Sequence, residues 1–129
     1  MCYSLPLLVI IGFVLGGWWN YLAVVYTFLL IPLLDQFIGE DTGNVPEADR
    51  QRLEESLYFR LITIAWALFQ PVFLLICCLA LTTSPWGFGA LFGFVLGTSL
   101  VTGGIGITIA HELGHKQSKT ERVLSRVVL

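Results

Sequence analysis

The chain has two histidines, His111 and His115, and both lie in the segment "HELGH" at residues 111–115. Residues four positions apart lie on the same face of a helix, so the two imidazoles can be presented to one side. Imidazole nitrogens are common ligands of transition metals. Glu112 lies about 100° around the helix from His111, so we do not expect it in the same coordination sphere. The spacing therefore predicts half of a metal site.

The pattern H-E-x-x-H is also the zinc-protease signature, in which both histidines bind zinc and the glutamate is the general base. Its longer form, H-E-x-x-H-x-x-G-x-x-H, is excluded because Ser118 and Glu121 occupy the positions of the glycine and the third histidine. An intramembrane zinc protease would need one more acidic ligand, for which the candidates are Asp35, Glu40 and Asp41. A third interpretation is a non-enzymatic membrane packing module whose histidines bind nothing.

The composition indicates a membrane protein. Of the 129 residues, 56% are hydrophobic and 12% are charged, whereas soluble domains carry about 25% charged residues. The mean hydropathy is +0.80. The net charge of −2 and the lack of a basic patch give no reason to expect a nucleic-acid partner. The N-terminus has no basic region typical of a signal peptide, so its apolar residues are interpreted as membrane spans.

The first apolar stretch, residues 5–34, is longer than one span requires. The segment "GGWWNY" at 16–21 interrupts it with two glycines and with aromatic residues typical of membrane interfaces. We expect a hairpin of two short helices over 5–16 and 20–34. One long tilted helix is the alternative.

Two further spans are expected over 61–81 and 88–110, joined by a short uncharged turn. Pro71 predicts a kink in the first of them. Gly89, Gly93 and Gly97 repeat at intervals of four in the second, and such rows of small residues let helices approach closely. The predicted fold is all-α, a polytopic transmembrane helical bundle with about four membrane helices in two hairpins.

The basic residues predict the orientation of this single membrane region. All seven Lys and Arg lie in the segment 35–60 or in the tail 111–129, and none lies in the two turns. By the positive-inside rule the segment 35–60 is a cytoplasmic loop and the tail is cytoplasmic. This orientation places His111 and His115 at the cytoplasmic edge of the last span.

Three motifs together resemble a known family: "IPLLDQFIGED" (31–41), "NVPE" (44–47) and "TIAHELGHKQS" (108–118). The resemblance is to the integral-membrane alkane 1-monooxygenases, which are non-haem diiron enzymes related to membrane fatty-acid desaturases, and it extends over essentially the whole chain. It implies a full fold of about six transmembrane helices, whose histidine motifs hold two irons on the cytoplasmic side.

The resemblance also implies an activity. Such an enzyme hydroxylates the terminal methyl of medium- or long-chain n-alkanes to 1-alkanols with O2, in the bacterial inner membrane. Its electrons come from rubredoxin, which is reduced by rubredoxin reductase. His111 and His115 match the first histidine motif and inherit the role of iron ligands. Glu112 and Lys116 match motif positions and are expected to support those ligands, although Lys116 is equally suited to be a snorkelling membrane anchor.

An alkane has no polar group, so its binding depends on apolar enclosure, at about 0.8 kcal/mol per buried CH2. Trp18, Trp19 and Phe69 are candidates to line such a substrate channel. An ordinary interface or packing role is the alternative for each of them.

The sequence also departs from the family pattern, because the later histidine clusters and a segment resembling N-Y-x-E-H are absent. Two histidines are too few for a diiron centre. We therefore expect the chain to be the N-terminal part of a longer enzyme and to be inactive alone.

Overall fold

The computed structural model describes residues 3–38, 57–115 and 118–128, and every element in these ranges is helical. Helix α1 (Ser4–Leu15) is followed by a long helix that winds through η1 (Gly17–Tyr21), α2 (Leu22–Val25), η2 (Tyr26–Leu30) and α3 (Ile31–Ile38). The remaining elements are α5 (Leu57–Thr83), then α6 (Phe88–Ser99), η3 (Leu100–Gly106) and α7 (Ile107–His115) in one continuous helix, and finally α8 (Lys119–Val128).

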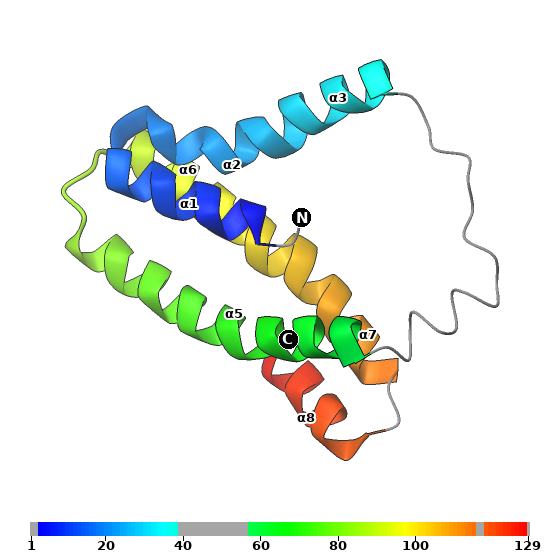
Figure 1. Cartoon of the computed structure of the whole chain (residues 1–129). Coiled ribbons are helices and arrows are strands. Elements are labelled where there is room, and N and C mark those ends of the chain that lie inside the picture. The colour runs from blue at the N-terminus through cyan, green and yellow to red at the C-terminus, as the bar shows by residue number, and fades with distance from the viewer. Residues whose placement is uncertain (1–2, 39–56, 116–117, 129) are drawn as a thin grey trace.

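Three helices are long and apolar enough to cross a membrane: Gly17–Ile38, Leu57–Thr83 and Phe88–His115. The fourth apolar helix, α1, has 12 residues and is about 18 Å long, which is shorter than the ~30 Å hydrocarbon core. These helices confirm the predicted all-α membrane bundle. Figure 1 shows α1 beside α6, α3 extending away from the other helices, and α8 packed beneath one end.

The first hairpin turns at two glycines. The φ angles of Gly16 and Gly17 are 73° and 57°, in the left-handed region that only glycine adopts without strain. The N–H of Gly16 donates a 2.9 Å hydrogen bond to the carbonyl of Gly12 and so ends α1. The first apolar stretch therefore folds as two antiparallel helices.

The two turns of the bundle lie together at one end (Figure 1). The ring of Trp86, between α5 and α6, packs edge-on against Phe13 of α1 with centroids 4.7 Å apart. The hydroxyl of Tyr21 donates a 2.9 Å hydrogen bond to the carbonyl of Gly89. This end of the molecule is thus closed by aromatic contacts.

The row of glycines on α6 allows close approach, as predicted. The ring of Tyr21 lies directly over Gly93, where a Cβ would collide with it. A Cβ at Gly97 would lie 3.2 Å from the side chain of Val9 and 3.4 Å from that of Ala23. These glycines therefore seat α6 against both helices of the first hairpin.

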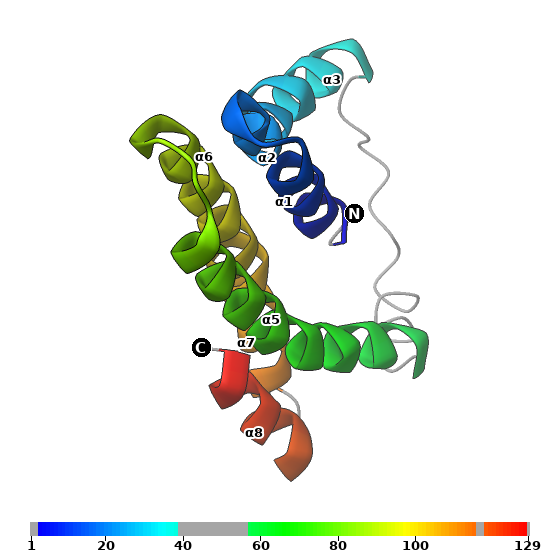
Figure 2. The same ribbon diagram turned by 90° about the vertical axis from the view of Figure 1, so that its left-hand side faces the viewer.

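Irregular stretches shape the long helices, among them a π-helical segment and a proline. Segment η3 is a π-helical stretch of seven residues, in which the turns are wider than in an α-helix. Helix α5 contains Pro71, and Figure 2 shows that the axis of α5 bends along its length. Proline inside a helix removes one backbone hydrogen bond and is a common cause of such bends.

Candidate metal centre

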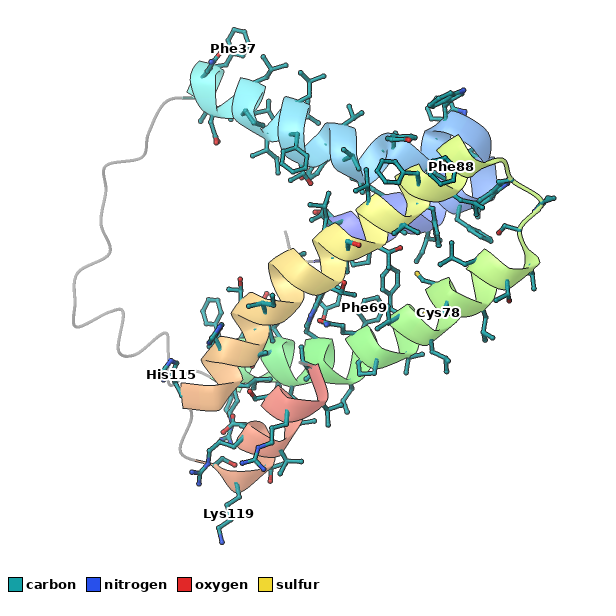
Figure 3. All side chains as sticks on the ribbon, turned by 180° about the vertical axis from the view of Figure 1, so that it is seen from behind. Phe37, Phe69, Cys78, Phe88, His115 and Lys119 are labelled. Carbon is teal, nitrogen blue, oxygen red and sulfur yellow. The ribbon has the colours of Figure 1, made fainter. Side chains whose placement is uncertain are left out.

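The two histidines lie on the exposed face of α7. Both side chains are exposed, whereas Ile109, Ala110 and Leu113 of the same helix are buried. With about 100° of rotation per residue, the histidines point roughly opposite to this buried face. Figure 3 shows His115 directed away from α8. The structure therefore presents both imidazoles on one open side of the helix.

This pair can supply only part of a coordination sphere. Neither imidazole forms a hydrogen bond or an ion pair with the part of the chain that the structure describes. Within residues 3–38, 57–115 and 118–128, no group of three His, Cys, Asp or Glu side chains could hold a metal. Asp35 is therefore not brought to the histidines. Two neutral nitrogen donors suit iron, zinc, copper or nickel, and further ligands are needed to complete a site.

The other predicted site residues are placed as follows. Glu112 is exposed on α7. Lys116, Glu40 and Asp41 lie outside the described residues. The structure thus supplies a position for one of the two residues expected to support the ligands.

The reverse face of α7 is held by α8. The hydroxyl of Ser125 donates a 2.7 Å hydrogen bond to the carbonyl of Ala110. The same oxygen would lie 3.3 Å from a Cβ placed on Gly114. Helix α8 therefore approaches the backbone of α7 closely, on a side that the imidazoles do not occupy.

Helix α8 is in turn fastened to α5 at both ends. Near its start, Glu121 is 3% exposed and accepts a 2.6 Å hydrogen bond from Arg60 Nε. Near its end, the carbonyl of Val128 accepts a 3.3 Å hydrogen bond from the Gln70 side-chain amide. The Gln70 carbonyl oxygen accepts a 2.7 Å hydrogen bond from Trp66 Nε1. Buried polar groups are stable only when they are paired in this way.

These contacts were not predicted from the sequence. A signal was present in the sequence, because Glu121, Ser125 and Val128 recur at helical spacing and would share one face of α8. A second signal was Gln70, a polar residue inside an apolar span.

A separate apolar cavity of about 190 Å³ lies among α1, α5 and α6. Phe69 borders it, together with Val9, Phe13, Phe73 and Phe94. Trp18 and Trp19 do not border it: they are 79% and 56% exposed at the turn end of the bundle. The structure brings Phe69 together with other apolar side chains and leaves the two tryptophans at the surface.

Comparison with known proteins finds relatives over most of the chain. No protein-family model matches it. The chain is 31% identical over 115 residues to alkane 1-monooxygenase 1 of Alcanivorax borkumensis, which is 88% of this chain and 28% of that protein. It is 29% identical over 132 residues to alkane 1-monooxygenase 2 of Pseudomonas aeruginosa, which is 93% of this chain and 35% of that protein.

A third relative is the alkane 1-monooxygenase of Pseudomonas putida, 28% identical over 118 residues. The alignment covers 92% of this chain and 27% of that protein. The chain thus spans between about a quarter and about a third of the length of these relatives. The resemblance predicted from the motifs is confirmed.

Proposed function

We propose that this chain, similar over about nine-tenths of its length to alkane 1-monooxygenases, forms part of a membrane enzyme that hydroxylates n-alkanes at the terminal carbon. The observation that carries the proposal is the pair His111 and His115, which lies within the motif that resembles the alkane 1-monooxygenases and is presented on the open face of α7. Medium- or long-chain alkanes are the substrates, and O2 supplies the oxygen atom.

In this proposal the two imidazoles are ligands of an iron centre whose remaining ligands come from elsewhere in the enzyme. Iron held by such histidines supplies the activation of O2. The role of α7 is to hold both nitrogens on one side, at the end of a membrane helix. Glu112 and Lys116 are proposed to support the ligands rather than to bind the metal.

The proposed membrane side of the histidines follows from the distribution of basic residues. Helix α8 carries Lys119, Arg122 and Arg126 at the same end of the bundle as the histidines. Basic residues next to membrane helices favour the cytoplasmic side. We place the histidines on the cytoplasmic face of a bacterial inner membrane, where rubredoxin, itself reduced by rubredoxin reductase, can deliver electrons.

The apolar environment supports a hydrocarbon substrate. Helices that cross the bilayer can receive an alkane directly from the lipid, and its binding requires only apolar enclosure. Trp18, Trp19 and Phe69 remain proposed channel residues. Of the three, Phe69 has the strongest support because it borders the apolar cavity.

A chimera tests the proposal with this chain as it stands. Residues 1–129 would replace the matching segment of the Alcanivorax borkumensis alkane 1-monooxygenase 1. Membranes containing the chimera would be supplied with octane, O2, NADH, rubredoxin and rubredoxin reductase, and 1-octanol would be measured. We expect the chimera to form 1-octanol, and residues 1–129 alone to form none because two histidines cannot hold two irons.

His111→Ala and His115→Ala in the chimera should each abolish the product and lower the iron content. Val123→Ala, on the exposed face of α8, is the matched control and should retain both. A chimera that inserts into the membrane and keeps its activity without either histidine would refute the proposal.

A further inference from the structure

Ser125 of helix α8 faces α7 at two particular residues. The Ser125 hydroxyl donates to the carbonyl of Ala110, and it lies against Gly114. Ala110 directly precedes His111, and Gly114 directly precedes His115. One serine therefore lies against the backbone next to both histidines, about 100° around α7 from the average direction of their imidazoles.

Helix α8 is also fixed in space independently of α7. The Arg60–Glu121 ion pair attaches its first turn to α5, and the hydrogen bond from Gln70 attaches its last turn. Ser125 lies between these two attachments. A helix anchored at both ends, with its middle against a neighbour, resists both displacement and rotation of that neighbour.

The buried carboxylate makes this arrangement specific. Glu121 is 3% exposed, and a charge removed from water is stable only beside its partner. Arg60 is half-exposed but donates to it at 2.6 Å. Glu121 also lies in the first turn of α8, where the helix dipole favours a negative charge. These effects favour one position of α8 over others.

We propose that α8 supports the helix end that carries the histidine pair, and that Ser125 is the residue that positions this end. Ser125 fixes the height and rotation of the last two turns of α7, so that His111 and His115 stay aligned on one side. This inference rests on the proposed role of the histidines as metal ligands. Ser125 itself touches neither imidazole.

The test uses the 129-residue chain in phosphatidylcholine nanodiscs, with Ni²⁺ as the probe because imidazole binds nickel well. Calorimetric titration gives the Kd. Hydrogen exchange of the amides of residues 107–115 gives a second measurement that needs no metal. His111→Ala establishes which part of the Ni²⁺ binding depends on the pair.

We expect Ser125→Ala to weaken His-dependent Ni²⁺ binding by about three- to tenfold, the equivalent of one lost hydrogen bond. Amide exchange in 107–115 should accelerate by a similar factor, while exchange in α6 stays unchanged. Val123→Ala, on the exposed face of the same helix, should alter neither measurement.

Gly114→Ala gives a second variant of the same contact. Its methyl group would lie 3.3 Å from the Ser125 hydroxyl, so we expect it to push the two helices apart and to weaken Ni²⁺ binding as well. In the double variant Gly114→Ala/Ser125→Ala the obstructing oxygen is gone. The double variant should therefore bind Ni²⁺ better than the sum of the two single effects predicts.

The outcomes distinguish the support of α7 by α8 from the metal-binding role of the histidines. If Ser125→Ala and Gly114→Ala leave both the Kd and the amide exchange unchanged, the proposal that α8 supports α7 is wrong. If the wild-type chain shows no His-dependent Ni²⁺ binding, the metal role fails, and amide exchange in the two variants still decides whether α8 holds α7. Strictly additive effects in the double variant would overturn the role of Ser125 in positioning.

Discussion

The two ends of the bundle are held together by different forces. At the turn end, α1, η1 and α6 meet mainly through aromatic rings and through glycines that allow backbone contact, with one hydrogen bond from Tyr21 to Gly89. At the histidine end, α5, α7 and α8 meet through an ion pair and hydrogen bonds between residues far apart in sequence.

This difference matches what each end has to do. Apolar and glycine contacts are short-ranged and depend on shape, so they fix how closely helices pack. Hydrogen bonds and ion pairs depend on direction, so they also fix how helices are rotated. The end that presents the two histidines is the one at which an ion pair and several side-chain hydrogen bonds fix α8 against its neighbours.

The largest effect is expected at the turn end. A Cβ on Gly12 would lie 2.5 Å from the carbonyl oxygen of Trp19, which is backbone and cannot move away easily. Gly12→Ala should lower the free energy of unfolding by about 3 kcal/mol. Thermal unfolding in detergent micelles, followed by circular dichroism, would measure it.

Gly87→Ala is the control for this prediction. Gly87 has a φ of −69° and nothing within 4 Å of its Cβ position, so the change should stay within about 0.5 kcal/mol. Equal effects of the two substitutions would mean that close packing at Gly12 does not hold the hairpin.

The next largest effect is expected in the ion pair at the histidine end. Arg60→Ala leaves the carboxylate of Glu121 buried without this partner. We expect a loss of about 2 kcal/mol, less than for a fully buried pair because Arg60 is half-exposed. Glu121→Gln removes the charge itself and should cost about 1 kcal/mol.

The same thermal unfolding experiment would measure both losses of unfolding free energy. Which of the two variants loses more is the informative result. A larger loss for Glu121→Gln than for Arg60→Ala would show that the buried carboxylate is satisfied by something other than Arg60.

A smaller effect is expected at Gln70. Gln70→Leu would leave Trp66 Nε1 and the carbonyl of Val128 without the partners that they have now. The expected loss is about 1–2 kcal/mol, with faster amide exchange in α8 than in α6. Unchanged exchange in α8 would show that Gln70 does not anchor that helix.

The smallest effect is expected at Trp18, which is 79% exposed. Trp18→Ala should change the unfolding free energy by less than about 0.5 kcal/mol in detergent. If Trp18 lines a substrate channel, the same substitution in the octane-oxidising chimera should change the preferred alkane chain length. An unchanged preference would leave Trp18 as a membrane-interface residue.

Much of the fold could be predicted because membrane helices are encoded locally. Runs of apolar residues predict spans, and the glycine row predicts close packing of α6, which the contacts of Gly93 and Gly97 confirm. The histidine spacing likewise depends only on the geometry of one helix. Such features require no knowledge of what lies opposite in space.

The contacts at the histidine end could not be predicted in the same way. Arg60 and Glu121 are 61 positions apart, and Gln70 and Val128 are 58 apart. Periodicity shows that Glu121 and Ser125 share a face, but not which helix that face meets. Charge alone assigns Arg60 and Glu121 to solvent, whereas the structure buries Glu121.

The wide turns of η3 change the angle around the helix axis at which residues before and after this segment point, in the helix Phe88–His115. Counted at 100° per residue without interruption, His115 would fall at the same angle as Gly97 and His111 within about 40° of it. The structure instead buries Gly97 and exposes both histidines. A π-helical turn takes one residue more than an α-helical turn and so offsets the two halves of the helix. Deleting a single residue within 100–106 would let this segment form a regular α-helix in the same phase, so the imidazoles should stay on the exposed face.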